Sequence, residues 1–355
     1  MDKSYIPALT GLRGVAAWWV VLYHFSEPLI GVVPTWFQTT VSFGYLAVDL
    51  FFILSGYVIY TSAGDALGNF SRLSIRRFIL SRWIRIYPLH FAVLLLYLLN
   101  PLALWLFGSS GIPEGRYSTD YFIASIFLVH NLGVFESLQW NIPSWSISVE
   151  FAAYLICPFL IAFGASRLKS SLTLLMIGVV SGFVLLAYLF SVNAKSSLGD
   201  AIPTMGLIRC LFEFWVGLCL GAICEKCRLP DNFWNRVLRT MMLTLLVVFS
   251  IGLFSAGVPD YYFVPIVFFL VIFLFVQGDA MFSAVLSTPG IHYLGLISYS
   301  TYLIHYFVKD WVKFLSEEIG LLQFVIYIVF CFACSILAYA FIERPSQKLL
   351  REKFL

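Results

Sequence analysis

The first candidates for chemistry are Arg13 and His24, which lie in the apolar run LTGLRGVAAWWVVLYHF at residues 9–25. Their separation of eleven residues is close to three helical turns, so both side chains lie on one stripe, ~16 Å apart along the axis. A cation within a membrane span usually faces the protein interior, because contact with hydrocarbon costs at least ~2.5–3.5 kcal/mol. The spacing therefore predicts an interior stripe with a fixed cation near one end and a titratable base near the other.

Two acidic residues in other apolar runs are candidates to orient the His24 imidazole. Asp49 lies in the run VSFGYLAVDLFFILSGYVIY, whose opposite direction puts its carboxylate at the depth of His24. Glu150 lies about two turns into the run that begins NIPSWSISVE. A buried acid in a membrane needs a partner, so we expect Asp49 or Glu150 to fix the imidazole tautomer. Further along the Asp49 run, Ser55 supplies a hydroxyl and Gly56 permits close approach of a neighbouring helix.

Four more polar residues in apolar runs have a structural and a functional interpretation. Arg209 and Glu213 are four residues apart, the helical spacing of an ion pair, and we expect them to pair with each other. Tyr299 and His305 could line a polar cavity. Tyrosines in membrane helices also form interfacial belts, so both interpretations of Tyr299 stay open.

A basic segment, FSRLSIRRFILSRWIRIYP, covers residues 70–88. Such an amphipathic segment can lie on the inner membrane surface, attracted by anionic lipid headgroups. Alternatively, Arg82 and Arg85, at positions i and i+3, can direct two guanidinium groups at one phosphate group. We expect Pro88 to end this segment and to start the next span.

The composition indicates a polytopic membrane protein. Of 355 residues, 61% are hydrophobic and 12% are charged, and the mean hydropathy is +0.90. Soluble domains average about 25% charged residues. The net charge of +3 gives no reason to expect a nucleic-acid partner. The seven cysteines follow no secreted disulfide pattern. Cys331 and Cys334 lie in an apolar run, and Cys224 and Cys227 lack a second ligand pair, so we expect no metal site.

Hydropathy predicts an all-α bundle with about ten transmembrane helices and one short re-entrant piece at 120–133. The predicted spans are 8–28, 42–62, 87–107, 144–164, 171–191, 203–224, 239–257, 262–278, 291–312 and 320–342. These spans leave little room for a separate soluble domain. We therefore expect a single transmembrane domain over residues 1–355, with no fused soluble domain.

The distribution of lysine and arginine sets the predicted orientation. With ten crossings and a cytoplasmic N-terminus, the inner segments hold most of the basic residues. The outer segments then keep only Arg116, Lys195, Lys309 and Lys313. This bias follows the positive-inside rule, and it predicts that both termini are cytoplasmic. It also places Arg13 toward the cytoplasm and His24 near the outer face.

Six motifs in order along nearly the whole chain resemble the acyltransferase 3 family of integral membrane enzymes. They are TGLRGVAAWWVVLYHF, VDLFFILSG, SRWIRIYP, PSWSISVEF, LGLISYSTYLIH and IERP. Three positions depart from the family pattern: Ala47 and Tyr57 stand where glycine and phenylalanine are frequent, and Ser81 stands where an arginine often occurs. The last departure weakens the phosphate interpretation but leaves Arg82 and Arg85 in place.

The resemblance implies an O-acyltransferase of the cell inner membrane that uses acyl-CoA, with acetyl-CoA as the expected co-substrate, and holds no permanent cofactor. The acyl-CoA phosphates would lie on Arg82 and Arg85, and the pantetheine arm would pass Arg13 and Ser55. His24 would act as general base on a hydroxyl of a cell-surface glycan or its lipid-linked precursor, with direct transfer and a covalent acyl-enzyme both left open.

A second class of function also fits buried ionisable residues. A proton-coupled transporter that exports a glycan or lipid would need His, Asp, Glu and Arg within its spans. No inverted repeat or pair of broken helices is visible in the sequence, and the arginine-rich segment suits a nucleotide donor better. These features favour the enzyme.

Overall fold

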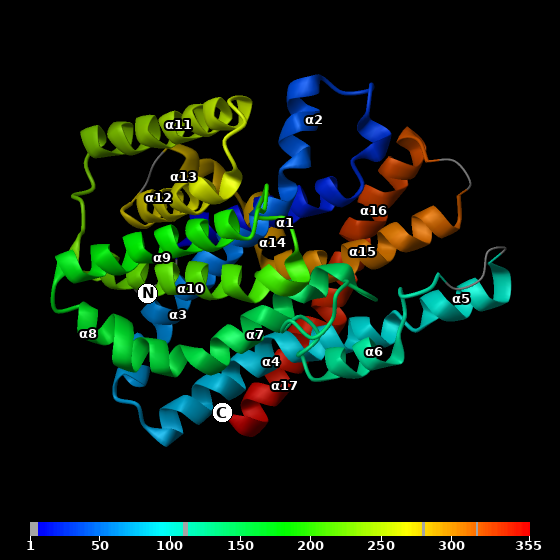
Figure 1. Ribbon diagram of the computed structural model, residues 1–355, viewed down its shortest axis with the longest axis horizontal. Coiled ribbons are helices and arrows are strands. Elements are labelled where there is room, and N and C mark those ends of the chain that lie inside the picture. The colour runs from blue at the N-terminus through cyan, green and yellow to red at the C-terminus, as the bar shows by residue number, and fades with distance from the viewer. Residues whose placement is uncertain (1–5, 109–112, 279–280, 317–318) are drawn as a thin grey trace.

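The computed structural model describes residues 6–108, 113–278, 281–316 and 319–355 (Figure 1). Within these ranges the chain forms helices and connecting loops, without strands. This confirms the predicted all-α fold class.

The α-helices follow one another along the chain, with short 3-10 or π-helical pieces between several of them. The α-helices are α1 (Pro7–His24), α2 (Thr35–Ser42), α3 (Ala47–Gly68), α4 (Arg72–Leu96), α5 (Leu99–Phe107), α6 (Thr119–Ile126), α7 (Trp145–Phe159), α8 (Ser166–Leu168), α9 (Leu172–Val192), α10 (Ile202–Lys226), α11 (Phe233–Ser255), α12 (Val264–Val276), α13 (Met281–Leu286), α14 (Pro289–Leu296), α15 (Ser298–Phe314), α16 (Leu321–Ala338) and α17 (Arg344–Phe354). The shorter pieces are η1 (Glu27–Leu29), η2 (Gly44–Leu46), η3 (Ile142–Ser144), η4 (Leu160–Ala165), η5 (Asp260–Tyr262) and η6 (Tyr339–Glu343).

Seven helical stretches in the described part of the chain are long and apolar enough to cross a membrane. They are Thr35–Gly68, Arg72–Phe107, Ile142–Ala165, Leu172–Val192, Ile202–Lys226, Phe233–Ser255 and Leu321–Phe354. The three remaining predicted spans coincide with α1, with α12 and with α14 followed by α15. The re-entrant prediction coincides with α6, whose eight residues rise only ~12 Å, far less than a bilayer core.

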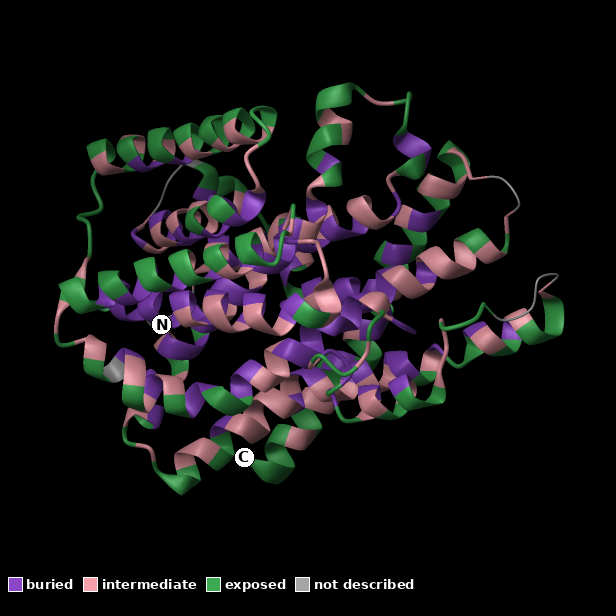
Figure 2. Cartoon of the chain, in the orientation of Figure 1, coloured by how far each residue is buried: buried purple, intermediate pink, exposed green. Residues whose placement is uncertain are grey.

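The centre of the molecule is the crossing of α3 and α10. Gly56 of α3 and Gly217 of α10 face each other there. A Cβ on Gly56 would overlap the Phe214 carbonyl oxygen, and one on Gly217 would overlap that of Ile53. The expected close approach at Gly56 is thus confirmed. Figure 2 shows burial concentrated in these central helices, whereas α11 is exposed along most of its length.

The basic segment and the following span form one helix. We expected Pro88 to separate them, but α4 continues through Pro88 from Arg72 to Leu96. That prediction was wrong because membrane helices tolerate proline where neighbouring elements compensate for the missing backbone hydrogen bond. As a result, Arg82 and Arg85 stand on the same rigid helix that enters the apolar part of the molecule.

Candidate active site

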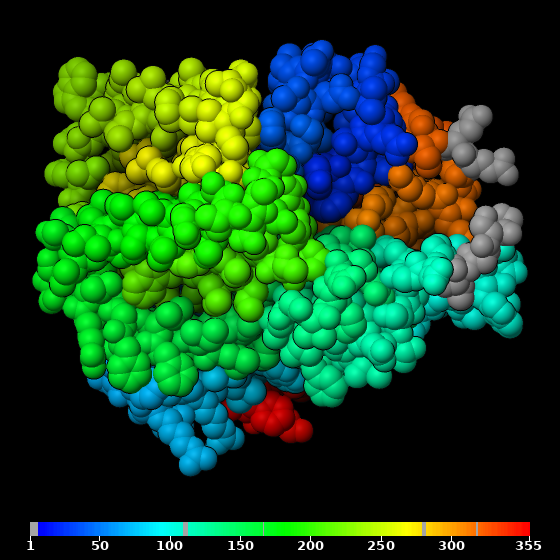
Figure 3. Space-filling model, in the orientation of Figure 1, coloured from blue at the N-terminus to red at the C-terminus, as the bar shows by residue number. Residues whose placement is uncertain are grey.

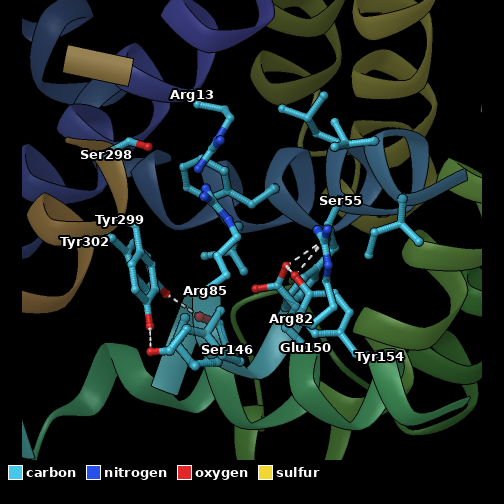
Figure 4. A pocket seen from close by; sticks show the side chains of 18 residues that line it. Arg13, Ser55, Arg82, Arg85, Ser146, Glu150, Tyr154, Ser298, Tyr299 and Tyr302 are labelled. Carbon is cyan, nitrogen blue, oxygen red and sulfur yellow. Dashed lines mark hydrogen bonds between the residues drawn. The ribbon is translucent and has the colours of Figure 1, made fainter. Parts of the chain in front are cut away.

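One cavity of about 120 Å³ lies between α1, α3, α4, α7 and α15. Its polar lining, labelled in Figure 4, consists of Arg13, Ser55, Arg82, Arg85, Ser146, Glu150, Tyr154, Ser298, Tyr299 and Tyr302. We name it the arginine cavity. It brings together six of the nine residues that the sequence singled out: Arg13, Ser55, Arg82, Arg85, Glu150 and Tyr299.

The three arginines give this cavity an excess of positive charge. Figure 4 shows the guanidinium groups of Arg13 and Arg85 pointing toward each other. In the described ranges, none of the three arginines lies within ion-pair distance of a carboxylate, although Glu150 lines the same cavity. Partly buried guanidinium groups that outnumber the carboxylates in the same lining are suited to bind an anion, above all phosphate.

Glu150 is held by two hydroxyl groups instead of by histidine. The Ser55 hydroxyl donates to Glu150 Oε1 at 2.7 Å, and the Tyr154 hydroxyl donates to the same oxygen at 2.5 Å. The sequence analysis does not predict Tyr154 as a site residue. Its position one helical turn after Glu150 is the signal that could have identified it.

The tyrosines on α15 close another wall of the cavity. The Tyr299 hydroxyl donates to the Ile86 carbonyl at 2.6 Å, and the Tyr302 hydroxyl lies 2.8 Å from Ser146 Oγ. Tyr299 is therefore a cavity residue and not part of an interfacial belt. Nearby, the buried Glu343 accepts a hydrogen bond from the Ser300 hydroxyl at 2.6 Å. Glu343 belongs to the motif IERP, and the sequence gives no other sign that it lies near the cavity.

A second cavity of about 360 Å³ contains His24. Its lining comes from α1, η2, α3, η3, α7, α10, α15 and the loop between α9 and α10. The residues are Val20, Tyr23, His24, Tyr45, Val48, Ile142, Pro143, Trp145, Gly199, Ile202, Arg209, Tyr302 and Tyr306. We name it the histidine cavity.

The two cavities share a wall. Val48 and Tyr302 belong to the lining of both. Arg13 and His24 thus both line interior cavities, as their spacing on α1 predicted, but each lines a different one. Along the predicted interior stripe, the two cavities meet at these two shared side chains.

The ring nitrogens of His24 and His305 form a linked pair. His305 Nδ1 lies 3.2 Å from the Thr301 carbonyl oxygen, and His24 Nδ1 lies 3.0 Å from that of Val20. A carbonyl oxygen only accepts, so both Nδ1 atoms carry the proton in the neutral rings. His305 Nε2 is then an acceptor, and it lies 3.2 Å from His24 Nδ1.

This arrangement fixes the chemistry of His24. Its Nδ1–H is shared between Val20 O and His305 Nε2, so Nε2 is the nitrogen with the free lone pair. No described residue hydrogen-bonds to that atom. A neutral imidazole with an unengaged Nε2, lining a cavity, has the state that a general base requires.

Neither acidic candidate orients the His24 ring. Asp49 is fully buried and pairs with Arg209, whose Nε donates to Asp49 Oδ1 at 2.6 Å and whose Nη2 donates to Asp49 Oδ2. Glu150 is engaged by Ser55 and Tyr154. The expected contact of Asp49 or Glu150 with His24 is therefore wrong, because a buried carboxylate binds most strongly to a bidentate guanidinium or to nearby hydroxyls.

The expected Arg209–Glu213 pair is also wrong. Arg209 directs its guanidinium to Asp49 and to the Leu198 carbonyl at 2.9 Å. The i, i+4 spacing could not reveal this, because the partner comes from another helix. The histidine pair was missed for the same reason, since its members lie 281 residues apart.

This chain is similar to known proteins over nearly its whole length. A family model described as an acyltransferase domain matches residues 6–340. The Bacillus subtilis (strain 168) protein YrhL, provisionally named a peptidoglycan O-acetyltransferase, is 27% identical over 366 residues, which cover 97% of this chain and 55% of YrhL. The O-acetyltransferase OatA of Staphylococcus aureus (strain NCTC 8325 / PS 47) is 25% identical over 371 residues, covering 98% of this chain and 58% of OatA.

The chain thus spans somewhat more than half the length of these relatives. No solved structure matches it. The family match covers most of the sequence, including the first five motifs on which the resemblance was based, and the apolar helices are those of a multi-pass membrane protein. The chain therefore belongs to the acyltransferase 3 family.

Proposed function

We propose that this protein is an O-acetyltransferase of the cytoplasmic membrane. It moves an acetyl group from cytoplasmic acetyl-CoA to a hydroxyl of a cell-surface glycan or of its lipid-linked precursor. The observation that carries this proposal is the pair of cavities that meet at Val48 and Tyr302, one with three arginines and the other with a neutral imidazole. The names of YrhL and OatA support acetyl as the transferred group, and the name of YrhL supports a glycan as the acceptor.

The arginine cavity is the donor site in this proposal. Arg82 and Arg85 bind the phosphates of acetyl-CoA, and the pantetheine arm runs past Arg13 and Ser55 toward the shared wall. The excess of guanidinium groups over carboxylates in the lining supports an anionic donor.

The transfer step uses His24 and His305. His24 Nε2 removes the proton from the acceptor hydroxyl while the oxygen of that hydroxyl attacks the thioester carbonyl carbon. The carbon–sulfur bond of the thioester then breaks. His24 returns the proton to the departing sulfur, so that the products are the acetyl ester and CoA with a free thiol. During the step the imidazolium Nδ1–H is stabilised by Val20 O and His305 Nε2. His305 thereby takes the place that an acid holds in a catalytic triad.

The direct test measures transfer of radioactive acetyl from acetyl-CoA to isolated cell-wall glycan by the purified protein in lipid nanodiscs. We expect His24→Ala to lower kcat by ~10²–10⁴-fold, the usual contribution of a general base. Intact acetyl transfer by a correctly inserted His24→Ala variant would refute the proposed role of His24. Rapid-quench labelling without acceptor distinguishes direct transfer from an acyl-enzyme, which would retain the label.

A matched pair of variants tests the donor site. Arg85 lines the arginine cavity, whereas Arg76 is exposed on the same helix. Arg85→Gln should raise the KM for acetyl-CoA by ~10–100-fold, as expected for a lost charge-assisted hydrogen bond of ~1.5–3 kcal/mol. The KM for acetylpantetheine, which lacks the nucleotide, should not change, and Arg76→Gln should alter neither. Equal losses with both donors would contradict a phosphate role for Arg85.

A further inference from the structure

We propose that the histidine cavity is an acceptor site built for an uncharged sugar ring, and that the loop between α9 and α10 limits the size of the sugar it admits. The inference rests on the proposed function, which leaves open where the acceptor binds and what selects it. Three features of the cavity carry it: its charge, its aromatic lining and the backbone that forms one wall.

The histidine cavity carries little free charge. Its one strongly charged lining residue, Arg209, is neutralised by the buried Asp49. The imidazole of His24 carries no charge when its Nε2 is free. The Lys309 ammonium lies 3.4 Å from the centroid of the Tyr306 ring but is not part of the lining. The lining itself therefore offers a ligand no net charge to pair with, in contrast to that of the arginine cavity. This favours a neutral polyol over a phosphate or a carboxylate.

Aromatic rings dominate the lining, and two of them flank the base. The rings of Tyr23 and Tyr306 lie edge-on to the His24 ring, at centroid distances of 4.9 and 5.2 Å. Tyr45, Trp145 and Tyr302 complete the aromatic part of the wall. A pyranose ring has apolar C–H faces and hydroxyl edges, and a cavity of aromatic faces with a few polar groups complements it.

The hydroxyls of these tyrosines are engaged in different ways. Tyr45 donates to Asp260 Oδ2 at 2.5 Å, and Tyr302 is engaged by Ser146. The hydroxyls of Tyr23 and Tyr306, by contrast, have no hydrogen-bond partner among the described residues. Both rings contact the His24 ring, so their hydroxyls can hold the hydroxyls that neighbour the one undergoing acetylation.

The loop wall is fixed by buried side chains. Leu198 N–H donates to Asp260 Oδ1 at 2.7 Å, and the Leu198 carbonyl accepts from Arg209 Nη1 at 2.9 Å. Asp260 also binds Tyr45 and Arg209 binds Asp49, so the loop is attached to η5, η2, α3 and α10. A wall held this firmly sets the dimensions of the cavity.

Asp200 stabilises the turn of the loop itself. It accepts hydrogen bonds from the backbone N–H groups of Ser196 and Ser197 at 2.8 and 3.0 Å. Burial acts to raise the pKa of the Asp200 carboxyl, and the hydrogen bonds from Ser196 and Ser197 outweigh it, so the pKa lies below its usual 3.8. The carboxylate therefore stays ionised, and the turn intact, throughout the neutral pH range.

Gly199 is the loop residue that faces the histidine cavity. A Cβ at Gly199 would lie 3.2 Å from Tyr45 Cδ2 and 3.3 Å from its Cε2, which is a tight contact. Any larger side chain must displace the Tyr45 ring or extend into the cavity. Gly199 thus determines how much room the acceptor has.

The experiment is a size series at Gly199 with the two substrates varied separately. Gly199→Leu and Gly199→Trp should raise the KM for a glycan acceptor about tenfold or more, in order of size, and leave the KM for acetyl-CoA unchanged. Tyr306→Phe, which keeps the ring and removes only the hydroxyl, should raise the acceptor KM several-fold. Lys195→Leu, in the same loop but outside the cavity lining, is the matched control and should change neither constant.

A reciprocal variant and a binding measurement complete the design. Val58 lines only the arginine cavity, so Val58→Trp should raise the KM for acetyl-CoA and not that for the glycan. Equilibrium dialysis without acetyl-CoA measures binding of neutral di- and trisaccharides of hexoses and N-acetylhexosamines to the wild-type protein and to Gly199→Trp.

The outcomes separate the two proposals. Saccharide binding that Gly199→Trp abolishes supports the acceptor site even if the wild-type protein transfers no acetyl group, which would refute only the proposed function. Acetyl transfer with an unchanged acceptor KM in Gly199→Trp would overturn the acceptor site alone. Absence of saccharide binding to the wild-type protein would also overturn it.

Discussion

In the proposed mechanism, backbone carbonyls and a second histidine prepare His24 to act as a base. The carbonyl oxygens of Val20 and Thr301, each one turn before its histidine, fix both tautomers. His305 accepts from a neutral ring as well as from a charged one, yet adds no negative charge to a buried site. A carboxylate in the same place would need compensation by a buried cation.

A pair of variants at His305 tests this role. His305→Phe keeps an aromatic ring but removes the acceptor for His24 Nδ1–H. We expect kcat to fall about tenfold or more, which is part of the ~10²–10⁴-fold that general-base catalysis contributes in all. His305→Gln can still accept through its amide oxygen and should keep a larger share of kcat. The KM for acetyl-CoA should be the same in both variants.

A purely structural role for His305 predicts a different pattern. His305→Phe and His305→Gln would then lower the amount of folded protein, each according to the packing defect that it causes. The kcat per folded molecule would stay unchanged. Thermal unfolding of the purified variants, measured beside the kinetics, separates the two explanations.

Single residues could be predicted from the sequence where their own helix determined their place. Arg13 and His24 follow from the period of α1, and Arg82 with Arg85 from that of α4. The partners of Asp49 and of His24 could not be predicted, because each lies on a different helix, and one sequence contains no information on which helices touch.

At the scale of elements, the crossing of α3 and α10 holds both cavities in place. α3 contributes Ser55 to the arginine cavity, and Val48 to both cavities, while α10 contributes Arg209 to the histidine cavity. The two helices approach so closely because Gly56 and Gly217 bring no side chain between them. Small residues play this part in many membrane helix pairs.

Gly217→Ala should therefore destabilise the protein. The added methyl group overlaps the Ile53 carbonyl oxygen, and overpacking of this kind costs ~1–3 kcal/mol. Gly252→Ala on α11 is the matched control, since a Cβ there meets no atom within 4 Å. Thermal unfolding in detergent should show a lower Tm for Gly217→Ala and an unchanged or slightly higher Tm for Gly252→Ala. Equal Tm values for the two variants would contradict the close-packed crossing.

The boundaries of elements were predictable to the extent that local signals set them. The lengths of the apolar runs predicted α9 and α10 closely. The predicted spans are 171–191 and 203–224, and the helices are Leu172–Val192 and Ile202–Lys226. Pro88 gave the wrong boundary because its effect depends on the neighbours of α4. The break between α14 and α15 at Ile297 also escaped prediction, because the apolar run 291–312 continues across it.

At the scale of the whole molecule, the number of crossings is the outstanding prediction. Among the residues that the structure describes, seven helical stretches meet the length and hydropathy of a span, and α12 is an apolar helix of only 13 residues, or ~20 Å. The helices α1 and α15 are not among these seven stretches, yet they carry His24 and His305. The polar side chains that make these helices functional also lower their hydropathy.

Cysteine labelling can determine the orientation. In a variant without the native cysteines, we expect Glu136→Cys and Ala256→Cys, both exposed, to react with a membrane-impermeant thiol reagent in intact cells. Arg72→Cys and Lys226→Cys, which are also exposed, should react only after the cells are opened. Ten crossings with a cytoplasmic N-terminus predict this pattern. Reaction of Lys226→Cys in intact cells would contradict the predicted topology.

The wall formed by Val48 and Tyr302 bears on the energetics of the cell. A continuous water-filled passage between the two faces of a coupling membrane would let protons run down their gradient. In the proposed function, two cavities that meet at a pair of side chains let a two-carbon unit change carriers, while the bulky nucleotide stays on one side and the polysaccharide on the other. On this arrangement, the cell could decorate its envelope without losing either coenzyme or membrane potential.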